Sequence, residues 1–325
     1  MIKTFLIAGF GTIGKKHIGI IKKLEPQSRI MLFRHKKTVK SEYEEFYDLG
    51  QALKQKPIAT IVANPTSEHI NVALKAAKEG VNLFIEKPLS NNMKGVNHLK
   101  KILNQKNIIV SIGYNMRFLE SLNFIKENLE NKTIGKVISA RLQVGQYLPD
   151  WNPSLDYSSM YSAKSELGGG VILTLSHELD YARWLFGEVK EVMAFSDKIS
   201  NLKIDVEDTA DVMLKFLSKS VATIHMDYLQ RVPSRTAEII GDNGMMTWQY
   251  IAHMNKVTIL TKNSIKVTEF PIDDMAMTYL KQISNFLKAI EGKTKPKVDL
   301  KEGIDTLKVA LAVKKSAKIH KKVRL

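Results

Sequence analysis

The sequence predicts an α/β protein of two domains: a first domain built on a parallel sheet, and a second, α+β domain with an open, mostly antiparallel sheet. Three observations predict this class. Short apolar runs alternate with helical patterns up to about residue 118. Beyond that point, apolar residues recur with period two, as in half-buried strands. The chain has 325 residues, 44% of them apolar, which is long enough for two cores.

The first domain follows from its alternation of strands and helices. Strands are predicted where short apolar runs end in glycine, proline or polar residues, at 5–9, 29–33, 58–63, 82–85 and 108–112. Helices are predicted at 12–24 and 69–79, and a lysine-rich helix lies between the last two strands. This alternation is typical of a parallel sheet with helices on both faces, so residues 1–118 form the predicted first domain.

The second domain, residues 119–325, is predicted to open with a helix at 119–129 and to close with helices at 278–291 and 300–322. The final helix is a candidate to pack back on the first domain. A sheet with one open apolar face needs a cover, so we expect a homodimer or homotetramer that forms through this face. Period-two runs predict the strands of the sheet at 137–144, 189–196, 209–217, 221–228, 236–240, 245–250 and 256–261.

Composition excludes several classes of protein. No run approaches the roughly 18–20 apolar residues of a membrane helix, and the apolar start of the chain reads as a buried strand, so we expect a cytoplasmic protein without a membrane partner. The absence of cysteine excludes disulfides, thiolate zinc sites and cysteine nucleophiles. The net charge of +16 is spread along the chain without a nucleic-acid motif, which favours solvated surface lysines over nucleic-acid binding.

Gly9, Gly11 and Gly14 form a GxGxxG pattern between the first predicted strand and the first predicted helix. Glycine permits a tight turn at 9, the approach of a pyrophosphate at 11, and close packing of helix and strand at 14. The N–H groups of Thr12 and Ile13 at the helix start then face the anion. In this context the pattern predicts a Rossmann domain that binds a nicotinamide dinucleotide rather than a merely flexible turn.

The residues about 20 positions further along distinguish NAD from NADP in such domains. Here the second predicted strand is followed by Arg34, Lys36 and Lys37, with no acid to bind a ribose hydroxyl. Cations suit the extra phosphate, so NADP(H) is the predicted cofactor, with Arg34 as the favoured contact, and NAD(H) is the alternative. A solvated basic loop would explain the same residues.

Further segments follow the glycine loop: Asn64-Pro65 with His69, Glu86-Lys87-Pro88, residues 113–118, the glycines at 168–170, and His177 to Asp180. In order and spacing this set resembles the glucose–fructose oxidoreductase / inositol dehydrogenase family (Gfo/Idh/MocA) over essentially the whole chain. The resemblance implies an NAD(P)-dependent oxidoreductase that transfers hydride between nicotinamide and a secondary alcohol or ketone of a sugar, cyclitol or sugar derivative. It implies no metal.

By this resemblance, Lys87 and His177 are the catalytic residues. Lys87 follows a predicted strand at the edge where parallel sheets bind ligands, and its amine would bind the oxygen on the carbon that exchanges hydride. Imidazole titrates near neutral pH, so His177 would take and return the proton of that oxygen. The residues implied on the cofactor side are Asn64, Pro65, His69, Glu86 and Lys87.

The sequence departs from the family pattern just before His177. Many members carry an aspartate four residues before this histidine, and Thr174, which carries no charge, stands about there in this chain. Asp180 lies one turn beyond His177 and is not an obvious replacement. The departure motivates an alternative function, a catalytically silent dinucleotide-binding sensor or regulatory protein of the same fold.

The predicted substrate contacts lie at the end of the last strand of the first domain, in the loop before the glycines, or beside His177. The aromatic loop that begins near Tyr147 would stack on a sugar or, equally, pack on itself. Arg231 and Arg235 are candidates for an anionic group or for salt bridges at an oligomer interface. The predicted contacts are Tyr114, Asn115, Arg117, Tyr147, Trp151, Thr174 and Asp180.

Overall fold

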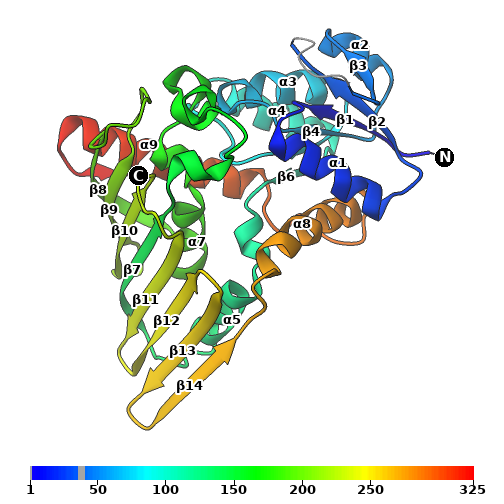
Figure 1. Ribbon diagram of the computed structural model, residues 1–325. Coiled ribbons are helices and arrows are strands. Elements are labelled where there is room, and N and C mark those ends of the chain that lie inside the picture. Colours follow the sequence, from blue (N-terminus) through cyan, green and yellow to red (C-terminus); the bar gives the residue numbers. More distant parts are fainter. Residues whose placement is uncertain (1, 36–40) are drawn as a thin grey trace. The chain divides into compact units, whose positions relative to one another are not determined.

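The chain divides into two compact units, which this computed structural model describes over residues 2–35 and 41–325 (Figure 1). The first unit comprises Met1–Asn115 and Met277–Asp305, and the second comprises Met116–Ala276 and Thr306–Leu325. The chain therefore returns to the first unit after most of the second is complete. The predicted α/β class, with one parallel and one mostly antiparallel sheet, is confirmed.

The first unit contains a six-stranded parallel sheet in the order β3-β2-β1-β4-β5-β6. Five of its strands were predicted, whereas β3 is only three residues long and too short to show a period. Neighbouring strands place alternate side chains on the two faces of the sheet. The strands are β1 (Thr4–Ala8), β2 (Arg29–Phe33), β3 (Glu44–Phe46), β4 (Ala59–Val62), β5 (Asn82–Ile85) and β6 (Val110–Ile112).

Helices cover this sheet, and α8 comes from far along the chain. Ile283 and Phe286 of α8 pack in one core cluster with Ile21 of α1 and with alternate strand residues such as Phe5 and Phe84. The rings of Phe84 and Phe286 lie 5.7 Å apart, edge to face. The helices are α1 (Thr12–Leu24), α2 (Leu49–Lys54), η1 (Thr66–Glu68), α3 (His69–Lys78), α4 (Val96–Lys106) and α8 (Asp274–Ile290).

The second unit contains a nine-stranded sheet in the order β14-β13-β12-β11-β7-β10-β9-β8-β15. Its pairs are antiparallel except for β7 and β10, which run parallel. The strands are β7 (Val137–Gly145), β8 (Val189–Asp197), β9 (Thr209–Phe216), β10 (Val221–Asp227), β11 (Ser234–Gly241), β12 (Gly244–Ile251), β13 (Met254–Thr261), β14 (Ser264–Glu269) and β15 (Val323–Arg324).

One face of this sheet packs on helices, and the other is open. Apolar side chains on the open face include Phe195 and Met213, which are 65% and 51% exposed. Within the described residues, no helix is long and apolar enough to cross a membrane. The helices of this part of the chain are η2 (Asn115–Phe118), α5 (Glu120–Glu130), η3 (Leu148–Trp151), η4 (Tyr157–Ser159), η5 (Tyr161–Ala163), η6 (Ser165–Leu167), α6 (Val171–Thr174), α7 (His177–Phe186) and α9 (Leu300–Ile319).

Candidate active site

The glycine loop lies where the strand order of the first unit reverses, between β1 and β4. Gly9 has a φ of +105°, and a Cβ there would lie 2.6 Å from the Ala63 carbonyl oxygen at the end of β4. A Cβ on Gly14 would lie 2.1 Å from the Gly9 carbonyl oxygen, so the start of α1 packs directly on the turn. A Cβ on Gly11 would meet no described atom within 4 Å, which leaves the helix N-terminus open on that side.

Asn64 and His69 connect the ends of β4 and β5. The two ring nitrogens of His69 lie 2.9 Å from the Pro88 carbonyl oxygen and 3.0 Å from the Asn64 carbonyl oxygen. The imidazole is buried, and this burial lowers the pKa of His69. The side-chain amide of Asn64 is buried and has no hydrogen-bond partner among the described residues, so it can still bind a polar ligand.

Glu86 and Lys87 follow β5, and Glu86 is held from both sides. One carboxylate oxygen lies 2.6 Å from Nε2 of His17 on α1, and the other accepts the Lys87 backbone N–H at 3.2 Å. Burial raises the pKa of Glu86, but the His17 hydrogen bond and the nearby positive charges outweigh this and lower it overall. The carboxylate is therefore charged at neutral pH, and it fixes the backbone from which the half-buried Lys87 side chain extends.

Arg34 directly follows β2 and is buried rather than free in solvent. Its Nη1 lies 2.7 Å from Oε1 of Glu45 in β3, and its backbone N–H donates to the Phe46 carbonyl oxygen. An acid therefore lies beside this position, although the residues after the second strand contain none. Lys36 and Lys37 lie outside the described residues.

Two residues of the predicted substrate set end the first unit, and both are engaged inside it. Tyr114 is fully buried. Asn115 is 3% exposed, and its side-chain amide donates to the Thr278 hydroxyl of α8 at 2.6 Å. Asn115 therefore connects the end of the last strand to α8.

In the second unit, His177 begins α7 and Thr174 ends the short α6. The triple glycine precedes α6, and Gly170 has a φ of +97° and lies against the Glu207 carboxylate. Thr174 lies beside the hydroxyl of Tyr228, whose burial raises its pKa well above the usual value. His177 is buried, with 8% of its surface exposed.

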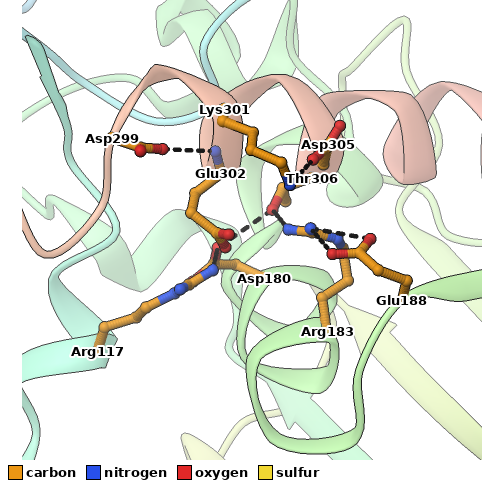
Figure 2. Close-up of polar contacts among 9 residues, drawn as sticks. All are labelled: Arg117, Asp180, Arg183, Glu188, Asp299, Lys301, Glu302, Asp305 and Thr306. Carbon is orange, nitrogen blue, oxygen red and sulfur yellow. Dashed lines mark hydrogen bonds and ion pairs between the residues drawn. The ribbon is translucent and has the colours of Figure 1, made fainter.

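Arg117 and Asp180 form a buried ion pair (Figure 2). Nε and Nη2 of Arg117 each donate to one Asp180 oxygen at 2.8 Å, and the Thr306 hydroxyl donates to Oδ1 at 3.1 Å. Arg183 donates to the same Thr306 oxygen and to both oxygens of Glu188. Both charges of the pair are therefore satisfied inside the protein.

Two further arginines have different surroundings. Arg235 donates from Nε to the buried Glu178 carboxylate at 2.6 Å, a pair that the sequence did not reveal. Arg231 is exposed and stacks on Tyr147, with 3.6 Å from the guanidinium carbon to the ring centre. Trp151 packs edge to face on Tyr228 and donates to the Gln146 carbonyl oxygen, so the loop partly packs on itself.

The edge of the first sheet fits a dinucleotide. Glycines replace side chains where the backbone must turn, the N-terminus of α1 is open, and the orphaned Asn64 amide lies next to this turn. The structure brings together the loops that carry Gly9, Asn64 and Glu86. The sequence patterns indicated no role for His17 or Glu45. The position of His17 on the apolar side of α1, beside Ile18 and Ile21, signals its burial, whereas Glu45 has no such signal.

Comparisons with known proteins agree with this geometry. A family profile described as "Oxidoreductase family, NAD-binding Rossmann fold" matches residues 3–114, and the profile "GFO/IDH/MocA C-terminal domain" matches residues 123–247. The chain belongs to the Gfo/Idh/MocA family of oxidoreductases. The resemblance that the sequence motifs indicated is therefore confirmed.

Several known proteins are similar to this chain over most of their length. Myo-inositol 2-dehydrogenase of Thermotoga maritima is 26% identical, over 98% of this chain and 97% of its own. The 1,5-anhydro-D-fructose reductase of Ensifer adhaerens is 25% identical, over 80% of this chain and 77% of its own. The WlbA dehydrogenase of Bordetella pertussis, solved with NADH and UDP-GlcNAcA, shares the fold with a TM-score of 0.85 at 20% identity, over 100% of this chain and 98% of its own.

Proposed function

We propose that this member of the family transfers hydride between a nicotinamide dinucleotide and a secondary alcohol or ketone of a sugar, cyclitol or sugar derivative. The observation that carries the proposal is the edge of the first sheet, where the glycine turn, the orphaned Asn64 amide and the Glu86-Lys87 segment converge. The substrate class draws on the similar proteins, which act on an inositol and on an anhydrosugar.

The dinucleotide supplies or accepts the hydride when bound. Gly9, Gly11 and Gly14 would hold its pyrophosphate at the N-terminus of α1, and Asn64 would offer its amide to the nicotinamide side. Lys87 would donate a hydrogen bond to the reacting oxygen and stabilise negative charge that develops on it. His177 would take the proton of the substrate hydroxyl during oxidation and return it to the oxygen during reduction.

The remaining predicted substrate contacts separate into two groups. Tyr147 and Trp151 are partly exposed and keep the role of contacts for a sugar ring. Arg117 and Asp180 satisfy each other, so we propose that they position the start of α7, and with it His177, without touching substrate. Asp180 thereby does not replace the carboxylate that Thr174 lacks, and His177 would work without a charged neighbour at that position.

The sensor alternative rests on Thr174 alone. The family assignment and the intact Lys87 and His177 positions favour the enzyme. We therefore propose catalysis rather than ligand sensing as the function of this site.

Turnover with a panel of polyols tests the proposal. Purified protein would be incubated with NAD⁺ or NADP⁺ and myo-inositol, scyllo-inositol, anhydrosugars or UDP-sugars, and nicotinamide absorbance would be followed. For an accepted substrate, Lys87→Met should lower kcat about 10²–10³-fold, since the variant loses the hydrogen bond that stabilises negative charge on the reacting oxygen. Lys94→Met, in the exposed segment before α4, is the matched control and should leave kcat unchanged. Bound cofactor without turnover on any polyol would contradict the proposed reaction.

The charges beside β2 bear on the choice between NAD(H) and NADP(H). Arg34 favours NADP(H) by its charge, but Glu45 balances that charge at 2.7 Å. NADH is the cofactor in the WlbA structure. We therefore propose that the enzyme uses NAD(H).

The open sheet face supports a homo-oligomer. Its exposed Phe195 and Met213 line a shallow groove with charged neighbours of both signs, among them Arg141 and Glu238, so a second copy could match it. Light scattering should give a multiple of 36.7 kDa, and Phe195→Asp should reduce it. A monomeric wild-type protein would contradict this assembly.

A further inference from the structure

Glu45 and Arg34 form a pair in which the positive charge is cancelled close to its source. The side chain of Arg34 is 6% exposed and that of Glu45 is 13% exposed. Oε1 of Glu45 lies 2.7 Å from Nη1 of Arg34. Such a pair offers N–H groups and carboxylate lone pairs but very little net charge.

The carboxylate of Glu45 is also held from its other side. Its second oxygen accepts the hydroxyl of Tyr47. The Tyr47 hydrogen bond, followed by Arg34, lowers the pKa of Glu45. Glu45 is therefore negatively charged at neutral pH.

The pair lies against the glycine loop. The guanidinium carbon of Arg34 is 5.4 Å from the ring centre of Phe10, the residue between Gly9 and Gly11. The ring of Tyr43 packs on the same Phe10 ring at 6.4 Å, edge to face. In a Rossmann domain the end of the second strand lies beside the ribose that carries either a 2′-hydroxyl or a 2′-phosphate. A dinucleotide bound at the glycine loop would therefore place its ribose 2′-position near Arg34 and its partner Glu45.

The two cofactors would meet this pair differently. A 2′-hydroxyl donates a hydrogen bond, which a carboxylate accepts. A 2′-phosphate carries close to two negative charges, finds Arg34 already neutralised, and is repelled by Glu45. Discrimination of this kind depends on the repulsive group as much as on the attractive one.

We propose that Glu45 is the specificity-determining residue for the cofactor and makes the enzyme prefer NAD(H) over NADP(H). Its carboxylate neutralises Arg34 and accepts a hydrogen bond from the ribose 2′-hydroxyl. This inference rests on the proposed function only in requiring that a dinucleotide binds at the glycine loop. Loss of the carboxylate leaves the buried guanidinium of Arg34 without this counter-charge, so one substitution should change the preference.

The experiment measures the Kd of NADH and of NADPH by nicotinamide fluorescence for the full chain and three variants. Wild-type protein should bind NADH more tightly. Glu45→Gln should tighten NADPH binding by about tenfold or more relative to NADH, because one repulsive charge is removed and one attractive charge is released. Glu44→Gln is the matched control, since Glu44 is the preceding residue of β3 but is exposed and pairs with Arg29. Its ratio of affinities should equal that of the wild type.

A double variant tests whether the change acts through Arg34. In Glu45→Gln combined with Arg34→Gln, the gain for NADPH should disappear. Thermal protection by 2′,5′-ADP and by 5′-AMP should show the same change of preference among the variants. These ligands carry the 2′-phosphate and the 2′-hydroxyl, respectively, without the nicotinamide end.

The outcomes separate this inference from the proposed function. Wild-type preference for NADPH, or an unchanged ratio in Glu45→Gln, would overturn the role of Glu45 while dinucleotide binding stands. The wild-type preference is measured without any variant, so it decides even if Glu45→Gln fails to fold. Absence of binding of both dinucleotides to wild-type protein would overturn both proposals.

Discussion

The sheet edge of the first unit and the helical layer of the second unit both hold buried charges, but they hold them in different ways. Glu86 is fixed by one histidine nitrogen and one backbone N–H, and the neighbouring Lys87 stays half exposed at a strand end. Arg117 and Asp180 instead pair with each other, with Thr306 as a further donor to Asp180, and they are almost inaccessible. The first arrangement places charged groups at the end of a strand, whereas the second uses its charges to hold helices together.

The largest expected effect comes from the turn that supports the first arrangement. Gly14→Ala places a Cβ only 2.1 Å from the Gly9 carbonyl oxygen, so the loop or the helix must move. We expect a loss of about 4 kcal/mol or more in the free energy of unfolding, measured by urea denaturation, or failure to fold.

Gly19→Ala in the same helix is the matched control. A Cβ there meets no described atom within 4 Å, and alanine favours a helix over glycine by up to about 1 kcal/mol, so this variant should be as stable as the wild type or more so. Equal stability of both variants would show that the turn does not depend on glycine at 14.

The buried pair of the second unit should give the next largest effect. Asp180→Asn leaves the Arg117 guanidinium buried without its counter-charge, and we expect a loss of about 3–5 kcal/mol in urea unfolding. Glu130→Gln, which breaks the exposed Lys126–Glu130 pair on α5, should cost less than about 0.5 kcal/mol. A cost below 1 kcal/mol for Asp180→Asn would mean that the pair does not hold this unit together.

His17 provides a direct comparison between the units, since it forms the buried pair of the first. His17→Phe removes the partner of one Glu86 oxygen, and we expect a cost of about 1–3 kcal/mol in thermal or urea unfolding, smaller than that of Asp180→Asn because Glu86 keeps its backbone donor. His98→Phe, on the exposed side of α4, serves as the control. A larger loss for His98→Phe than for His17→Phe would contradict the assignment.

The smallest effect is a pH dependence at the open sheet face. The hydrogen bond to Asp227 and then that to Asp211 raise the pKa of His225 to about 9 from 6.5. This stabilisation is fully present below pH 6.5 and is lost as the pH rises through about 9. The imidazole is 37% exposed, so we expect less than about 1 kcal/mol.

Urea midpoints at pH 6, 7.5 and 10 would measure this effect. His225→Gln should lower the midpoint at the two lower values and match the wild type at the highest. A constant difference across the range would assign the loss to packing instead of charge.

Sequence patterns predicted the first unit better than the charged contacts within either unit. The apolar runs of β1, β2, β4 and β5 and the glycine turn are local signals, because each element carries its own period. Glu45 gives no such signal, because β3 has only three residues. The role of Glu45 depends on its contact with Arg34, eleven positions earlier in the chain.

Contacts between distant segments explain most of the rest. Arg117 and Asp180 were predicted to face a substrate, and 63 residues separate them in the chain, so no local pattern shows that they meet. The open sheet of the second unit was predicted from period two, but its order was not, because strand pairing such as that of β7 with both β10 and β11 is non-local.

The discontinuity of the first unit has a consequence for its biosynthesis. Ile283 and Phe286 of α8 fill the face of the sheet that carries Phe84, yet about 160 residues are translated between the two parts of this unit. At the usual rate of synthesis this interval lasts on the order of 10–30 s, during which the emerging nucleotide-binding half exposes an apolar surface. A chain released early, with α8 missing, would present this surface to chaperones or proteases instead of folding as a separate domain.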